Sequence, residues 1–265
     1  MPNSSKAIGI FDSGLGGLTV LSQVTKRLPN ETIIYLGDTA RVPYGTKSAD
    51  TVVRYARSCA SLLLSRGIKL LIVACNTASA YALETLRSEL DIPVVGVIQP
   101  GATAVAARTK TRRVGVIGTA GTVASGAYVR EIHAIDAEIQ VYSKACPLFV
   151  PLAEEGWTDG DVPRTVATEY LKELTTYDID ALVLGCTHYP LLKRVIADIM
   201  GDGVALVDSA ETTADTVSRL LAGSPNVKAN GAHYHFMVSD APESFARVGK
   251  RFLGHDIDHV EWVDF

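Results

Sequence analysis

Two cysteines stand at matching points of this chain. Cys75 follows the apolar run Leu70–Ala74, and Cys186 follows the apolar run Ala181–Gly185. Short apolar runs bounded by turn residues are typical of buried strands in parallel sheets. Polar residues that can start a helix come directly after each cysteine. The pattern therefore predicts each thiol at the carboxyl end of a strand and beside the amino end of a helix.

This position favours a reactive thiol. The positive end of a helix dipole stabilises a thiolate, and the predicted helix caps are Asn76 or Thr77 in the first case and Thr187 in the second. His188 lies two residues after Cys186, and a protonated imidazole there would favour the thiolate further. Zinc binding is the rival interpretation, but Cys-x-His supplies only two of the ligands that zinc needs.

The surroundings of the two cysteines also repeat. Each half of the chain has a strand and a glycine-containing turn, at 7–14 and at 113–122. Ser13 and Thr119 stand in these turns, 62 and 67 residues before the cysteines of their halves. Because the cysteines are 111 positions apart, the repeat predicts two related domains and not a solenoid. If the domains face each other, the two thiols oppose across one cleft.

The remaining cysteines lie outside this pattern. Cys59 falls within a helical pattern and Cys146 precedes Pro147, so we predict that both are structural. The segment Met1–Lys6 is polar, and we do not expect it to act as a signal peptide. We therefore expect four reduced thiols and a cytoplasmic location.

The bulk composition excludes several classes of function. The 265 residues are 47% hydrophobic and 20% charged, as in ordinary globular proteins, and no apolar run reaches the length of a membrane-spanning helix. A net charge of −4 and a pI near 5.9 give no electrostatic basis for binding nucleic acid. We expect neither a membrane nor a nucleic-acid partner.

Strand and helix patterns alternate along the chain, which predicts an α/β fold of parallel sheets covered on both faces. We predict two pseudo-symmetric domains, each a mainly parallel sheet flanked by helices, with the active site in the cleft between them. Residues 1–98 plus 208–265 form the first domain and 99–207 the second. A late strand at 233–238 is expected to join the first sheet. The other expected strands are 7–11, 32–37, 69–74, 93–98, 113–117, 138–143, 181–185 and 204–207, with helices at 18–28, 49–66, 80–90 and 163–174.

Two further segments carry candidate binding residues. The backbone amides of Asp12–Gly17 and the hydroxyl of Ser13 can bind a small anion such as a carboxylate. A dinucleotide site is disfavoured there, because Thr19 stands where Gly-x-Gly-x-x-Gly has its third glycine. Val42–Gly45 has the composition of an ordinary turn, and its functional alternative is that Tyr44 and nearby amides close over a substrate.

Several of these runs together resemble the glutamate racemases, a family of cofactor-independent amino-acid racemases with two catalytic cysteines. The resemblance covers roughly residues 7–222, and the order of its motifs makes it specific. The matching runs are Phe11–Gly17, Gly37–Thr39, Pro43–Gly45, Ala74–Ala78, Pro151–Gly156 and Gly185–Pro190.

The resemblance implies interconversion of L- and D-glutamate, with Cys75 and Cys186 as the two groups that exchange the α-proton. It implies that Asp12 and His188 assist these thiols and that an acidic residue of a predicted loop also helps. Glu154 and Glu155 both stand in that loop, and we favour Glu154. The implied substrate-binding residues are Asp12, Ser13, Pro43, Tyr44, Gly45, Asn76, Thr77, Thr187 and His188.

The family further implies that no pyridoxal phosphate and no metal take part, that the protein forms a homodimer, and that it supplies D-glutamate for peptidoglycan. The alternative is an aspartate racemase or another cofactor-independent amino-acid racemase of the same family. It stays open because the thiol pair specifies the reaction more firmly than the side chain of the substrate.

Overall fold

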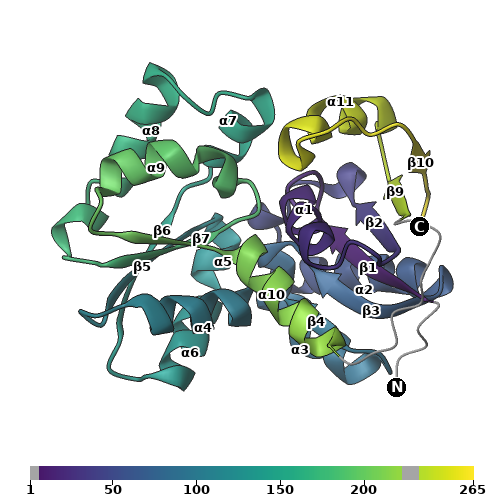
Figure 1. The fold of residues 1–265 in the computed structure, drawn as a ribbon, viewed down its shortest axis with the longest axis horizontal. Helices are drawn as coiled ribbons and strands as arrows, with labels where there is room; N and C mark the ends of the chain where they lie inside the picture. Colours follow the sequence, from purple (N-terminus) through teal and green to yellow (C-terminus); the bar gives the residue numbers. More distant parts are fainter. Residues whose placement is uncertain (1–5, 223–232) are drawn as a thin grey trace.

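The computed structural model describes residues 6–222 and 233–265, and it contains two sheets with helices on both faces (Figure 1). The strands are β1 (Ala7–Asp12), β2 (Ile33–Gly37), β3 (Ile68–Val73), β4 (Val94–Gly96), β5 (Arg113–Gly118), β6 (Gln140–Ala145), β7 (Ala181–Gly185), β8 (Ala205–Asp208), β9 (Tyr234–Val238) and β10 (Val260–Trp262). The first sheet has the order β10-β9-β2-β1-β3-β4, and the second has the order β6-β5-β7-β8. All of the described pairings are parallel, which confirms the predicted fold class.

Helices connect the strands, as parallel pairing requires. They are α1 (Leu18–Arg27), α2 (Ala49–Ser65), α3 (Asn76–Glu89), α4 (Ile98–Arg108), α5 (Ala120–Ala124), α6 (Ala127–Ile135), α7 (Phe149–Glu155), α8 (Asp161–Leu171), α9 (Lys193–Met200), α10 (Ser209–Leu221) and α11 (Pro242–Leu253). Short 3₁₀ turns are η1 (Thr39–Arg41), η2 (Tyr44–Thr46), η3 (Leu174–Thr176) and η4 (Tyr189–Leu192).

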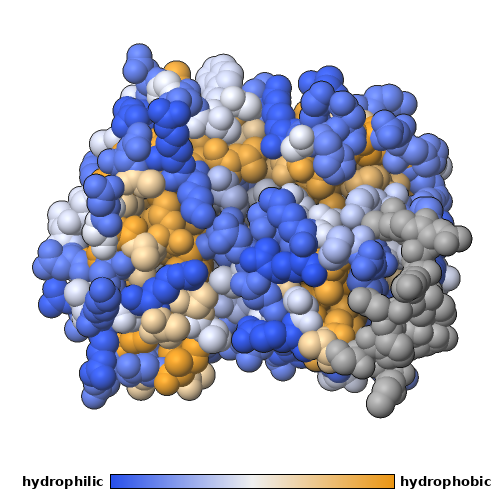
Figure 2. All heavy atoms as spheres, viewed as in Figure 1, coloured by the Kyte–Doolittle hydropathy of each residue, from blue (hydrophilic) through white to orange (hydrophobic). Residues whose placement is uncertain are grey.

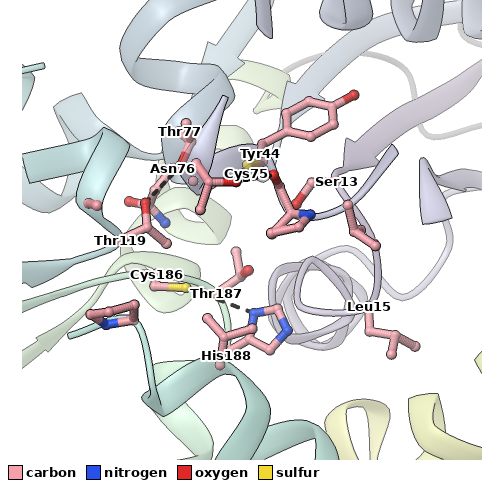
Figure 3. A pocket seen from close by; sticks show the side chains of 18 of the residues that line it. Ser13, Leu15, Tyr44, Cys75, Asn76, Thr77, Thr119, Cys186, Thr187 and His188 are labelled. Atoms are coloured by element: carbon pink, nitrogen blue, oxygen red, sulfur yellow. Dashed lines mark hydrogen bonds between the residues drawn. The ribbon is translucent and has the colours of Figure 1, made fainter. Parts of the chain in front are cut away.

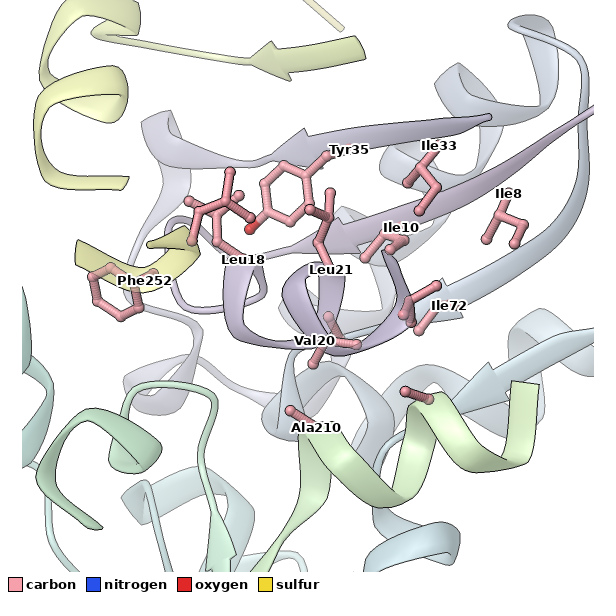
Figure 4. Close-up of a cluster of buried hydrophobic side chains, with 14 of the residues drawn as sticks. Ile8, Ile10, Leu18, Val20, Leu21, Ile33, Tyr35, Ile72, Ala210 and Phe252 are labelled. Carbon is pink, nitrogen blue, oxygen red and sulfur yellow. The ribbon is translucent and has the colours of Figure 1, made fainter. Parts of the chain in front are cut away.

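Each strand at the centre of a sheet buries both of its faces. In β1, Ile8 and Ile10 point into a cluster formed with α1, α10 and α11, which Figure 4 shows, whereas Phe11 packs on the other face with α2 and α3. The second sheet is covered by α7, α8 and α9 on one face and by α4 and α6 on the other. This double burial explains why the strands are continuous apolar runs and not alternating ones.

The two sheets divide the chain unevenly. Strands of the first sheet come from 7–96 and 234–262, and strands of the second come from 113–208. The predicted late strand is confirmed, because β9 pairs in parallel with β2. The domain boundaries at 98–99 and 207–208 stay a prediction, which this division of the strands supports.

The two halves are joined by more than their covalent connections. Helix α10 follows the last strand of the second sheet, yet its Ala210 packs into the same cluster as Val20 of α1 (Figure 4). Close to the carboxyl ends of the strands, the Thr19 hydroxyl donates a hydrogen bond of 3.0 Å to the carbonyl of Thr187. These contacts hold one half against the other beside the strand ends.

The surface of the molecule is mixed in polarity. Figure 2 shows polar residues over much of one face, with apolar residues between them. None of the helices within 6–222 and 233–265 has both the length and the hydropathy needed to cross a bilayer.

Candidate active site

Residues from both halves border one small cavity (Figure 3). Its volume is about 180 Å³, smaller than the roughly 300–1,000 Å³ of pockets that hold drug-sized ligands. It lies at the carboxyl ends of the parallel strands, the place where open α/β sheets bind ligands. Of the residues implied to form the site, those on the cavity wall are Ser13, Pro43, Tyr44, Gly45, Cys75, Asn76, Thr77, Glu154, Cys186, Thr187 and His188.

Cys75 comes two residues after β3 and is itself the N-cap of α3. The prediction that Asn76 or Thr77 would cap this helix is therefore wrong by one or two residues. The Cys75 sulfur accepts a hydrogen bond from the amide of Ala78 at 3.5 Å. Burial, with the nearby carboxylate of Asp12, raises the pKa of Cys75 to about 12, against the opposing effect of the Ala78 amide and the Ser13 hydroxyl. Without a ligand, this thiol is protonated near neutral pH.

Cys186 follows β7 on the opposite wall of the cavity (Figure 3). The chain continues here into η4, whose N-cap is His188, and α9 begins only after that turn. The predicted capping of a helix by Thr187 is thus wrong. The reason is local, because Pro190 in the first turn and the tight 3₁₀ conformation shift the start of the regular helix downstream.

A chain of polar contacts runs outward from Cys186. Its sulfur lies 3.8 Å from Nδ1 of His188, and Nε2 of His188 lies 2.9 Å from Oε1 of Glu154. Burial alone would lower the pKa of His188, but its contacts with Cys186 and Glu154 raise this pKa to about 10. The imidazole is therefore protonated at neutral pH, and a protonated imidazole stabilises a neighbouring thiolate.

Glu154 and Glu155 do not lie in a loop, as predicted, but in the last turn of α7. A helical turn sends consecutive side chains in different directions, and only Glu154 borders the cavity. Glu155 instead borders a separate surface hollow beside Trp157. Helix α11 of the first half supports this corner, because Arg251 donates a hydrogen bond to the Glu154 carbonyl and Phe252 packs edge-on against His188.

Asp12 lies behind the cavity wall. It is buried, one of its oxygens accepts the amide of Gly14 at 2.9 Å, and the other has no partner among the described residues. Burial raises the pKa of Asp12, while the charge of His188 and the backbone amides of Gly14 and Gly17 lower it in part. It is the one implied site residue that does not border the cavity, although it lies close enough to influence the pKa of Cys75.

The polar lining includes a residue that was not predicted as part of the site. The hydroxyl of Thr77, on α3, lies 2.9 Å from that of Thr119, which precedes α5 in the second half. Thr119 stands in the turn at 113–122, so the internal repeat was the signal that could have identified it. Asn76 accepts the Tyr128 hydroxyl at 2.8 Å, and its amide nitrogen has no partner among the described residues.

Apolar residues form much of the rest of the wall, and none of them is among the implied substrate-binding residues. They come from both halves and include Leu15, Val42, Ala120, Pro147, Val150 and Pro151. Apolar walls exclude water and strengthen polar interactions inside a cavity. The arrangement is therefore a small cavity with a thiol on each side and hydrogen-bonding groups between them.

A comparison with known protein families shows which family the chain belongs to. The model of the family "Asp/Glu/Hydantoin racemase" matches residues 17–217. The chain belongs to this family. The glutamate racemase of Geobacter metallireducens is 58% identical over 260 residues, which cover 97% of this chain and 96% of that protein.

Solved structures of family members agree over almost the whole chain. The glutamate racemase isoform RacE1 of Bacillus anthracis is 39% identical with a TM-score of 0.94, covering 99% of this chain and 98% of its own. The glutamate racemase of Francisella tularensis, solved in complex with D-glutamate, is 40% identical with a TM-score of 0.92 and the same coverage. The racemase family inferred from the motifs is thus confirmed.

Proposed function

We propose that the protein is a glutamate racemase, which interconverts L- and D-glutamate by moving the α-proton between two thiols. The observation that supports this most directly is the placement of Cys75 and Cys186 on opposite walls of one cavity. Racemisation requires removal of a proton from one face of the α-carbon and delivery of a proton to the other. Two acid–base groups facing each other meet this requirement.

Every proton in this reaction is supplied and taken up within the site. One cysteine, as the thiolate, takes the α-proton and becomes a thiol, and the electron pair stays on the substrate as a carbanion. The opposite thiol then gives its proton to the other face of that carbanion and becomes a thiolate. By the family resemblance, Cys75 acts on the D-enantiomer and Cys186 on the L-enantiomer. A reverse turnover restores the original protonation states, so the chemistry consumes nothing and calls for no cofactor.

The charged groups around the two thiols differ, and this supports a different helper for each. His188 carries a proton beside Cys186 and is held by Glu154 at 2.9 Å, so this pair favours the thiolate that acts on the L-enantiomer. Asp12 lies behind Cys75 and is proposed to assist it, including through attraction of the substrate ammonium. Positive charge from a bound ammonium would lower the pKa of Cys75 from its value in the empty cavity.

The other polar residues of the wall are proposed to bind the substrate. Ser13, Asn76, Thr77 and Thr187 can donate hydrogen bonds to its carboxylates and to the charge that develops at the α-carbon. Because the donors are fixed by the fold before substrate arrives, they stabilise this charge without reorganisation. Pro43, Tyr44 and Gly45 form the part of the wall that closes beside them.

Aspartate racemisation, the alternative left open by the motifs, lacks comparable support. The closely similar proteins reported above carry the name glutamate racemase, and the Francisella structure holds D-glutamate. We further propose a cytoplasmic homodimer whose D-glutamate serves peptidoglycan synthesis. The homodimer and the role in peptidoglycan synthesis rest on the family resemblance, and the location rests on the expectation of four reduced thiols.

The decisive experiment follows the circular dichroism of an L-glutamate solution in the presence of a chelator. The wild-type protein should bring the signal to zero. Cys75→Ala and Cys186→Ala should each lose at least about 10³-fold in kcat, because removal of one acid–base group leaves no path to the other face. Cys59→Ala and Cys146→Ala are the matched controls and should keep most of the activity. Normal turnover by either of the first two variants would contradict the mechanism.

A further inference from the structure

A buried carboxylate holds the cavity wall at Tyr44 from behind. Asp38 follows β2, has no exposed surface, and its amide donates to the carbonyl of Asp12 at 3.0 Å. Its carboxylate accepts hydrogen bonds from the hydroxyl of Tyr44 and from that of Ser239. Tyr44 borders the cavity and Asp38 does not, so the carboxylate of Asp38 contacts the cavity wall through the Tyr44 hydroxyl.

Arg41 supplies the positive charge that this carboxylate needs. Its Nε lies 2.7–2.8 Å from both carboxylate oxygens of Asp38. The guanidinium lies over two aromatic rings, at 4.6 Å from the centroid of Tyr55 and 4.6 Å from that of Phe265. Its Nη2 is buried and has no hydrogen-bond partner among the described residues. Stacking on the rings, and not a second ion pair, therefore keeps the group in place.

The turn that this network supports has few hydrogen bonds of its own. Within Pro43–Lys47, the hydrogen bonds are those from the Lys47 amide to the Tyr44 carbonyl at 3.0 Å and from the Thr46 hydroxyl to the Pro43 carbonyl at 3.3 Å. A turn with so few internal bonds depends on its anchored side chain. The anchor here is Tyr44, which is 1% exposed.

We propose that Arg41 is a positioning residue for the substrate cavity. Stacked on Tyr55 and Phe265, it holds Asp38, which fixes Tyr44 and with it the wall from Pro43 to Thr46. The proposal rests on the proposed function, because it assigns this wall to glutamate. The proposal adds Phe265 to the residues that support the cavity. Phe265 is far from the cavity motifs in sequence and is half-buried against the apolar cluster that includes residues of α2.

The first test measures how well the turn Pro43–Lys47 is ordered when no ligand is bound. Hydrogen exchange of the Lys47 amide should become at least about tenfold faster in Arg41→Ala and in Phe265→Ala than in the wild type. Phe265→Tyr should keep the protection of the wild type, because it keeps a ring over the guanidinium. Arg41→Lys should not, since an ammonium lacks the planar face with which the guanidinium stacks on the two rings. Arg54→Ala is the control: Arg54 lies 5.5 Å from the same Tyr55 ring but is exposed and makes no bond to Asp38.

The second test measures catalysis with the same variants. Arg41→Ala and Phe265→Ala should raise KM for glutamate about tenfold while kcat changes less than about threefold, whereas loss of folded protein would lower kcat alone. Combining Arg41→Ala with Tyr44→Phe should give less than the product of the two single effects on KM, because both act through Asp38. Multiplicative effects, or unchanged exchange at Lys47 in both Arg41→Ala and Phe265→Ala, would overturn the proposal. If the wild type failed to racemise glutamate, the proposed function would fail while the exchange measurement still tested the positioning role.

Discussion

A single methyl group added to Gly45 tests whether the two halves must meet as closely as they do here. A Cβ at Gly45 would stand 2.7 Å from the Cβ of Thr119 and 3.0 Å from its hydroxyl oxygen. Gly45 belongs to the first half and Thr119 to the second, and both border the cavity. The backbone of Gly45 has no positive φ, so alanine is compatible with the local conformation.

The size of the expected effect follows from the contact. Carbon atoms pack at about 3.5–4.0 Å, so the methyl group must push the halves apart by about 1 Å. A misplacement of about 1 Å of groups that must meet a substrate from two sides costs about 10²-fold in rate. This loss corresponds to about 2.7 kcal/mol of transition-state stabilisation. Global stability should change by less than about 1 kcal/mol, because opening the cleft relieves the clash without unpacking a core.

The assay is exchange of the glutamate α-proton in deuterated water, together with kcat/KM from circular dichroism. Gly45→Ala should lose about 10²-fold in kcat/KM at an unchanged melting temperature. Gly203→Ala is the control, because no atom lies within 4 Å of the added methyl group. In the Gly45→Ala background, Thr119→Gly should recover at least about tenfold, since it removes the atom that clashes. Activity of Gly45→Ala within threefold of the wild type would show that this close approach is not needed for catalysis.

Two further predictions concern charge and substrate choice. Because the pKa of His188 is raised from 6.5 to about 10 in the folded protein, its stabilising effect is complete below pH 6.5 and is lost as the pH rises toward 10. Urea unfolding at pH 6, 8 and 10 should therefore show a free energy of unfolding that declines more steeply with pH in the wild type than in His188→Asn, and equal declines would refute the assignment. The protein should also prefer glutamate to aspartate by more than about tenfold in kcat/KM, since a shorter side chain leaves donors in the cavity unpaired. Parallel initial rates with the two amino acids measure this ratio, and equal values would return aspartate to consideration.

The sequence predicted the parts of this structure that depend on local patterns. The apolar runs before Cys75 and Cys186 are the buried strands β3 and β7, because strands covered on both faces have no polar side to interrupt them. The family motifs likewise led to the residues that border the cavity. Helix starts were less predictable, since a cysteine can occupy the N-cap and a proline can favour a 3₁₀ turn before the regular helix.

Contacts between distant segments could not be predicted in this way. Nothing local to Phe252 indicates that it packs against His188, and nothing local to Phe265 indicates that it covers Arg41. Both depend on α11 and β10 returning to the first sheet after the second is complete. The motif resemblance ended near residue 222, before these elements begin. The motifs therefore indicated residues that border the cavity, but they could not indicate the residues that support the cavity wall from behind.

The internal repeat places one thiol at the carboxyl end of a strand in each half but surrounds the two with different charged groups. A carboxylate lies behind Cys75, and an imidazolium held by Glu154 lies beside Cys186. In the empty cavity the buried surroundings of Cys75 keep its proton in place. In the proposed mechanism, a substrate ammonium adds the positive charge that the Cys75 side lacks and so lowers the pKa of that thiol. A racemase must handle both enantiomers in the same cavity, and a substrate that itself activates the thiol that is otherwise protonated suits proton transfer in either direction.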